Sequence, residues 1–191
     1  MKQALSILIA TVAASMLIAC TKSGNALRAS IIGTWEMVSS QTSFTDKNGN
    51  PTSARDVIVA MYKANGMTDE QIAAMSSTID VTVSAMESGS QTAGMIRYHF
   101  ENDGRLKTSV KTGESWGNPI DSGSYQLDGD RLTLKITGGG QSISTVYTIL
   151  NVNDKELILQ VDSSKVSGSG VTDIYAQLGY KTTSMMAFRK I

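Results

Sequence analysis

Histidine and cysteine, two residue types with reactive side chains, each occur only once in this chain of 191 residues, and this limits the chemistry that the protein can perform. His99 is the only histidine, and Cys20 is the only cysteine. Together they cannot supply the histidine and cysteine ligand sets of the usual zinc sites. The run Gly138-Gly139-Gly140 lacks the Lys-Ser/Thr that follows the glycines of a phosphate-binding loop. We therefore predict a protein that is not an enzyme and that needs neither a metal ion nor a cofactor.

Alternating residues near 94–100 are the first candidates for ligand binding. Arg97 and His99 share one face of a predicted strand, and Tyr98 and Phe100 share the other. If Arg97 and His99 point inward, they are candidate partners for the anionic head group of a ligand. If Tyr98 and Phe100 face the core instead, Arg97 and His99 face water. This second alternative is favoured because arginine is rarely buried without a partner.

Methionines are the second candidate binding feature. Met61 and Met75 lie on the apolar stripes of two predicted helices. Flexible thioethers suit adaptable apolar sites, but they also fill gaps in a core. Core packing is the favoured interpretation for both residues, although a helical lid that packs with methionine can also repack around a lipid.

The first residues are typical of a secretory signal. Lys2 precedes a mostly apolar run, residues 4–19, which is too short to span a bilayer. The run ends Leu17-Ile18-Ala19-Cys20, which resembles the lipobox of bacterial lipoproteins. The resemblance implies that residues 1–19 are a signal peptide and that Cys20 is acylated. Its acyl chains would then be the contact between the protein and a membrane.

The lipobox also implies a location in the bacterial cell envelope. Thr21 follows Cys20 at the position where an aspartate would resemble an inner-membrane retention signal, so the outer membrane is favoured. Whether the protein faces the periplasm or the cell surface stays open. A protein partner in the envelope is an alternative to a small-molecule ligand.

Composition indicates one nearly neutral domain. Without residues 1–19, the chain has 191 − 19 = 172 residues, which is about one domain. It then carries 17 − 1 = 16 Lys+Arg against 17 Asp+Glu, so it lacks the basic surface of a nucleic-acid-binding protein. Residues 20–30 are mostly small and polar, and we expect them to form a flexible lipidated tether.

Eight strand-like runs follow the tether, near residues 31–44, 94–100, 105–111, 123–127, 131–137, 142–151, 156–161 and 183–190. Short turns such as Asp103-Gly104 and Asp128-Gly129 join consecutive runs into an antiparallel meander. We therefore predict an all-β fold, an eight-stranded antiparallel meander barrel. An open sandwich is the alternative that periodicity leaves.

The stretch of about 53–88, after the first strand, is predicted to be a helix pair. Val57, Ala60, Met61 and Ala64 recur at helical spacing. Thr68 and Gln71, three positions apart, have the spacing of a capping box at the start of the second helix.

The sequence Gly33-Thr34-Trp35, at the start of the first strand, resembles the Gly-x-Trp motif of lipocalins. The resemblance is to the lipocalin-like domains of small bacterial lipoproteins, and it implies a barrel over residues 31–191. It also implies that Trp35 closes one end of the barrel. A basic residue of the last strand, Arg189 or Lys190, would pack across the ring, and we take Arg189 as the motif residue. The helix pair is reminiscent of the lid of fatty-acid-binding proteins.

Two functions remain. The favoured function is non-catalytic binding of a small apolar or amphipathic molecule. The alternative is a structural or protein-interaction module whose barrel is filled with side chains. Trp116, in a polar loop, either contacts a partner or folds back over the barrel rim.

Overall fold

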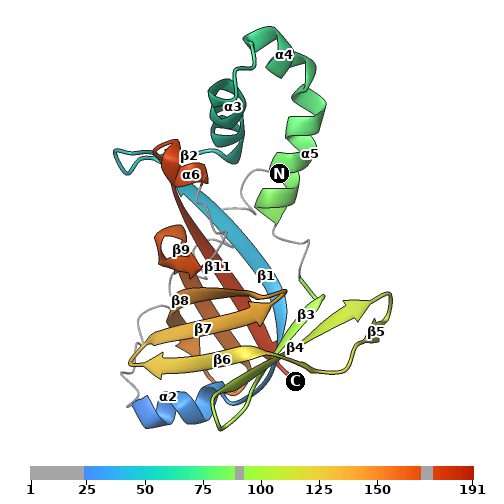
Figure 1. The fold of residues 1–191 in the computed structure, drawn as a ribbon, viewed down its shortest axis with the longest axis vertical. Coiled ribbons are helices and arrows are strands. Elements are labelled where there is room, and N and C mark those ends of the chain that lie inside the picture. Colours follow the sequence, from blue (N-terminus) through green and yellow to red (C-terminus); the bar gives the residue numbers. More distant parts are fainter. Residues whose placement is uncertain (1–23, 89–92, 169–173) are drawn as a thin grey trace, which may run out of the picture.

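The computed structural model describes residues 24–88, 93–168 and 174–191. Eight antiparallel strands pair in the order β1-β3-β4-β6-β7-β8-β9-β11, and β11 pairs with β1 to close a barrel. These strands are β1 (Gly33–Thr45), β3 (Ile96–Phe100), β4 (Arg105–Thr112), β6 (Ile120–Asp128), β7 (Arg131–Gly138), β8 (Gln141–Val152), β9 (Glu156–Asp162) and β11 (Lys181–Lys190). The ring confirms the predicted all-β meander barrel and rules out the open sandwich (Figure 1).

Strand alternation decides which side chains point into the barrel. Phe100 pairs with Leu106, and both are buried. Leu132 pairs with Leu127 and Tyr147, and all three belong to or pack on the barrel core. Because side chains alternate along a strand, residues two positions away from these also point inward.

Helix α2 (Gly24–Ile31) lies across one end of the barrel (Figure 1). Ile31 is fully buried in the barrel core, and Leu27 packs against that core. The expectation of a flexible tether over 20–30 is therefore wrong for its last seven residues. Leu27 and Ile31 are four positions apart and share a helix face, which a polar average composition conceals.

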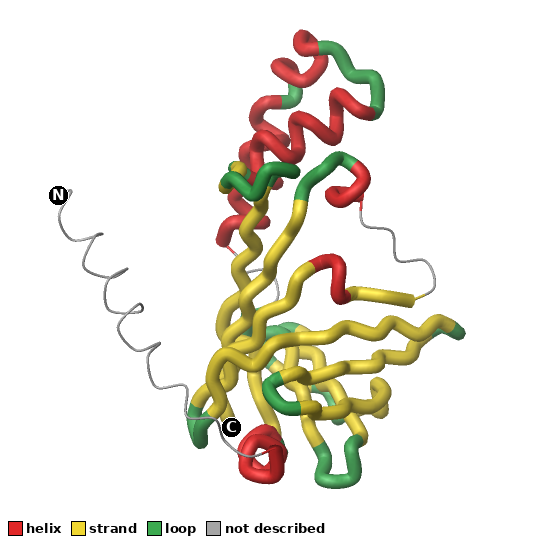
Figure 2. The backbone as a smooth tube through the Cα atoms, turned by 90° about the vertical axis from the view of Figure 1, so that its left-hand side faces the viewer, coloured by secondary structure: helices red, strands yellow, loops and turns green. Residues whose placement is uncertain are grey.

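At the other end, β1 and β11 continue beyond the barrel as a two-stranded arm (Figures 1 and 2). β3 pairs with β1 only from Gly33 to Glu36, whereas β11 follows β1 as far as Thr45. The short strand β2 (Pro51–Thr52) pairs with the end of β1.

The helical lobe consists of α3 (Ala54–Ala64), α4 (Asp69–Ala74) and α5 (Ser76–Ser88), and it lies at the end of the arm (Figure 1). Thr68 and Gln71 form the predicted capping box. The second helix of the predicted pair is two helices, because α4 ends with Met75 as its C-cap and α5 begins at Ser76. The lobe packs on itself and on β1.

Shorter elements complete the open end. β5 (Ser115–Trp116) pairs with the end of β4. After β9, the 3-10 helix η2 (Ser163–Lys165) leads to β10 (Val166–Gly168), which pairs with β8. Helix α6 (Ile174–Gln177) precedes β11.

Candidate functional site

The closed end of the barrel is built around Trp35, which is fully buried. Its indole Nε1 donates a hydrogen bond of 2.7 Å to the carbonyl oxygen of Ile31 in α2. The Lys190 ammonium lies 5.1 Å from the centroid of the ring. The predicted basic residue is therefore Lys190 and not Arg189, because Lys190 is the register partner of Trp35 and Arg189 points to the outer face.

Gly33 has a structural role in the same motif. Its φ of 128° lies in a region that other residues rarely adopt, and a Cβ there would lie 2.9 Å from Lys190 Cε. The Gly-x-Trp motif thus leaves space for the lysine that covers the tryptophan.

Large apolar side chains fill the barrel above Trp35, and we call this layer the floor. Its fully buried members are Phe100, Leu106, Leu132, Leu134, Leu157, Leu159 and Phe188. Packing of this kind fills the interior of the barrel at the end that α2 covers.

The inward-facing residues nearer the arm form a second layer, which we call the open layer. They are Ile96, Tyr98, Val110, Ile120, Ile136, Ile143, Tyr147 and Met186. Val110, Ile120 and Ile143 are 51%, 62% and 37% exposed although they point to the inside of the barrel. Apolar side chains that stay exposed on the inner face are typical of a binding site without its ligand.

Two tyrosines connect the floor with the open layer. The Tyr98 ring lies 5.5 Å from the Phe188 ring and 6.2 Å from the Phe100 ring, measured between centroids. Burial raises the pKa of the Tyr98 phenol above its ordinary value. Burial and the neighbouring Tyr98 hydroxyl also raise the pKa of Tyr147, with a smaller opposite effect from Thr145. Both phenols are therefore neutral hydrogen-bonding groups at ordinary pH.

Arg97 lies on the outer face of the barrel, as the favoured alternative of the sequence analysis has it. Its Nε and Nη2 donate hydrogen bonds of 3.0 and 2.7 Å to Glu36 Oε2, and Arg189 Nη2 donates one of 2.5 Å to Glu36 Oε1. Burial acts to raise the pKa of Glu36, but these two guanidinium groups outweigh it and hold the pKa below the ordinary value. Arg97 therefore has a carboxylate partner within the protein.

His99 is also on the outer face, between two hydroxyl groups. Its Nδ1 lies 3.0 Å from Thr34 Oγ1, and its Nε2 lies 2.8 Å from Ser109 Oγ. Burial, followed by the positive charges of Arg97 and Lys107, lowers the pKa of His99. Ser109 is buried, so this serine-histidine contact does not present a nucleophile to a substrate.

Trp116 folds back onto the barrel, but on its outer face and not over its rim. The Arg97 guanidinium carbon lies 3.7 Å from the centroid of the Trp116 ring. The surrounding sequence, from Gly113 to Gly117, has Gly-x-Ser-x-Gly spacing. In hydrolases this motif places its serine on a turn between a strand and a helix. Here Ser115 belongs to β5, which forms a hairpin with β4, so the nucleophile geometry is missing.

Met61 and Met75 do not lie with Arg97 and His99. Both belong to the helical lobe, where Met75 packs on the buried side chains of Ile58, Ile72 and Ile79. Met61 is half-buried on α3. The lobe stands on the arm, so these methionines do not cover the floor of the barrel (Figure 1).

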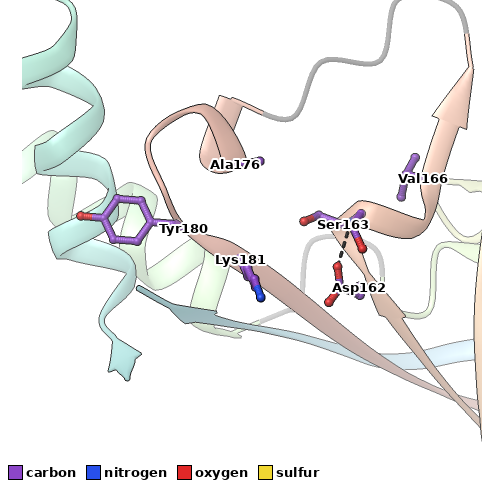
Figure 3. A pocket seen from close by; sticks show the side chains of 7 residues that line it. Asp162, Ser163, Val166, Ala176, Tyr180 and Lys181 are labelled. Atoms are coloured by element: carbon purple, nitrogen blue, oxygen red, sulfur yellow. Dashed lines mark hydrogen bonds between the residues drawn. The ribbon is translucent and has the colours of Figure 1, made fainter. Parts of the chain in front are cut away.

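A pocket of about 430 Å³ lies where the barrel wall divides (Figure 3). β9 follows β11 as far as Asp162, and the chain then turns through η2 to pair with β8. The pocket is lined by Asp162, Ser163, Ser164, Val166, Ala176, Tyr180 and Lys181. It carries one acidic and one basic side chain and lies outside the floor and the open layer.

Three sequence expectations concern metal binding, membrane-spanning helices and the lipidated N-terminus, and the described residues bear on them as follows. Within them, no group of three or more His, Cys, Asp or Glu side chains has the geometry to hold a metal ion. None of the helices in the described ranges is both long and apolar enough to cross a membrane. Cys20 and the signal peptide over 1–19 lie outside the described residues.

The fold and the two layers define a class of protein: an antiparallel eight-stranded barrel with one packed end and one open apolar end. The chain belongs to the lipocalin-like domain family, which matches residues 31–159. The match extends from the end of α2 into β9 and includes the helical lobe. Lipocalin-like barrels are generally non-catalytic. No curated protein matches the chain.

Sequence reasoning missed the open layer and the role of Glu36. The alternation of side chains along the strand puts Tyr98 on the face opposite to that of Arg97. This was the sequence signal from which an inward-facing hydroxyl could have been predicted. The two partners of Glu36, Arg97 and Arg189, come from the strands on either side of β1, and no local pattern encodes that arrangement.

Proposed function

We propose that this protein binds a small apolar or amphipathic molecule, without catalysis, in the open layer of its barrel. The observation that carries the proposal is the exposure of Val110, Ile120 and Ile143 on the inner face. Removing such apolar surface from water contributes about 25 cal/mol for each Å² that a ligand covers.

The floor limits where this ligand binds. Trp35, Phe100 and Phe188 fill the end next to α2, so the ligand enters from the side of the arm. This site is shallow compared with a barrel that is hollow throughout, and it favours a ligand that leaves one end near the surface.

The experiment is a titration with diphenylhexatriene, a hydrocarbon whose fluorescence increases in an apolar site. Ile143→Arg places a charge in the open layer and is expected to weaken binding at least about tenfold, because a buried charge without a partner is costly. Met185→Arg is the matched control, because Met185 has nearly the same exposure, 38% against 37%, but lies on the outer face. Equal binding by both variants and the wild type would place the probe elsewhere.

A structural or protein-interaction module is the second candidate. The packed floor favours it, because a filled barrel needs no ligand. The outer face of β1, β3 and β11, with Trp116 over Arg97, would then be the contact surface. Absence of diphenylhexatriene binding in the wild-type protein would favour this candidate.

We also propose that the protein is anchored in the cell envelope by acyl chains on Cys20, with the outer membrane favoured. The lipobox-like sequence from Leu17 to Cys20 supports this. Cys20→Ser is expected to leave an uncleaved precursor or to release the protein. A processed Cys20→Ser protein that still fractionates with membranes would contradict the anchor.

A further inference from the structure

The polar groups that point into the barrel above the floor share one chemistry. They are the hydroxyls of Ser40, Thr42, Tyr98, Thr108, Ser122, Thr145, Tyr147 and Ser184. In the described strands, no charged side chain points inward at this level. The one inward-facing charge, Lys190, lies below the floor against Trp35.

Charged strand residues occupy the outward positions instead. Arg97 and Glu36 pair across β3 and β1, and Lys107 lies opposite Asp121 across β4 and β6. Lys135 lies opposite Ser124, on the side of β7 away from Leu134. Strand alternation therefore keeps every one of these charges outside the barrel.

Four of these eight hydroxyls pair with each other across neighbouring strands. Thr42 Oγ1 lies 2.9 Å from Ser184 Oγ, and Thr108 Oγ1 lies 2.6 Å from Ser122 Oγ. The Tyr98 hydroxyl lies beside Tyr147, on a side chain that is largely removed from water and that points inward next to Phe100 and Phe188. A phenol hydroxyl both donates and accepts hydrogen bonds, so it can bond to an uncharged polar group of a ligand.

We infer that the open layer selects uncharged amphipathic molecules, an alkyl chain with an alcohol, ester or amide group, over anionic ones such as fatty-acid carboxylates. The polar group of the ligand bonds to the hydroxyl of Tyr98, beside Tyr147, and its chain contacts Val110, Ile120 and Ile143. A carboxylate would lose its hydration without gaining a cation, and burial of an unpaired charge is strongly unfavourable. This inference rests on the proposed function.

The test is competition against diphenylhexatriene on the wild-type protein by three ligands of equal chain length. These are dodecanol, methyl dodecanoate and dodecanoate, at neutral pH and below their aggregation concentrations. Dodecanol and the ester are expected to displace the hydrocarbon at concentrations at least about tenfold lower than dodecanoate. Equal or tighter binding of dodecanoate overturns the inference and leaves the proposed function intact. Absence of hydrocarbon binding overturns the proposed function, and the inference with it.

Two substitutions identify the groups responsible. Tyr98→Phe keeps the ring and removes the hydroxyl, so the affinity for dodecanol is expected to fall about three- to tenfold, as for one lost hydrogen bond. The affinity for diphenylhexatriene, which has no polar atom, is expected to stay unchanged and also shows that the variant is folded. Unchanged dodecanol affinity overturns the role of Tyr98.

A reversal of selectivity completes the test. Thr145→Lys adds a cation on the inner face of β8, and Thr148→Lys adds the same charge on its outer face. The Thr145→Lys protein is expected to gain affinity for dodecanoate, and the Thr148→Lys protein is not. A gain in both variants would mean that dodecanoate binds on the outer surface and would overturn the inference.

Discussion

The two ends of the barrel use inward-facing side chains in opposite ways. At the closed end, Trp35, Phe100 and Phe188 are fully buried, and α2 covers them. At the open end, Val110 and Ile120 also point inward but remain more than half exposed. The same alternation of residues therefore gives a stable core in one layer and an unsatisfied apolar surface in the other. Stability and ligand binding are thus assigned to different layers of a single sheet.

The helical lobe sharpens this contrast. Three of its buried residues, Ile58, Ile72 and Ile79, form a cluster separate from the barrel core, whereas Ala54 and Val57 pack with Phe44 near the end of β1. It joins the barrel mainly through β1 of the arm. We therefore expect the closed end to determine the global free energy of unfolding and the lobe to unfold locally.

The largest effect is expected from Trp35→Ala. Truncation of a large core aromatic side chain costs about 3–5 kcal/mol, which is a major share of the stability of a domain. Thermal or urea unfolding of the whole protein measures it. Trp116→Ala is the matched control, because this half-buried tryptophan lies on the outer face and is expected to cost far less. If both variants lost a similar amount of unfolding free energy, the floor would be no more important for stability than the outer face.

Ile79→Ala tests the independence of the lobe. Ile79 is almost completely buried in α5, and such truncations cost about 2–5 kcal/mol where the core cannot collapse. Because the lobe has its own core, hydrogen exchange is expected to accelerate in α3–α5 and to stay unchanged in β6 and β7. Equal acceleration in the barrel strands would show that lobe and barrel unfold as one unit.

Glu36→Gln is expected to have a smaller, global effect of about 2 kcal/mol, because hydrogen bonds to charged groups contribute about 1.5–3 kcal/mol. The pKa of Glu36 is lowered in the folded protein, so its contribution is present above the unfolded value near 4.5 and is lost as the pH falls through the folded value. Urea unfolding of wild type and variant at neutral and acidic pH measures both effects. Glu156→Gln, an exposed glutamate on the same face, is the control. If the Glu36→Gln protein were as stable as the control, the ion pairs of Glu36 with Arg97 and Arg189 would make no net contribution to stability.

Much of the barrel could be predicted from the sequence, because the alternation of apolar and polar residues is visible within each strand. Alternation separated Tyr98 and Phe100 from Arg97 and His99 but left open which face points inward. The rarity of buried arginine favoured the orientation that the structure has, so Arg97 and His99 do not line the inside of the barrel. The choice between Arg189 and Lys190 was wrong by one position, because only the register with Trp35 decides which of them points inward.

The open layer was not predictable by the same means. Val110 and Ile120 read as ordinary strand residues, and their exposure follows from where neighbouring strands end. The assignment of residues 24–30 to a tether failed for a similar reason, since the barrel core supplies the apolar partner of α2. Features that depend on several distant strands leave no periodic signal in one segment.

The smallest expected effect concerns His99, and it tests whether the outer face contributes to stability near neutral pH. Burial, with the nearby charges of Arg97 and Lys107, lowers the pKa of His99 below 6.5. A histidine with a lowered pKa in the folded state stays neutral there, while the unfolded chain takes up a proton. The free energy of unfolding therefore falls as the pH drops from about 6.5 towards about 5, above the range in which carboxylates titrate. In His99→Gln this slope is expected to disappear, and the variant, with its neutral amide between Thr34 and Ser109, loses less stability over that range than the wild type. If the free energy of unfolding depended on pH in the same way for both proteins, another group would cause the dependence, and the protonation of His99 would not be coupled to folding.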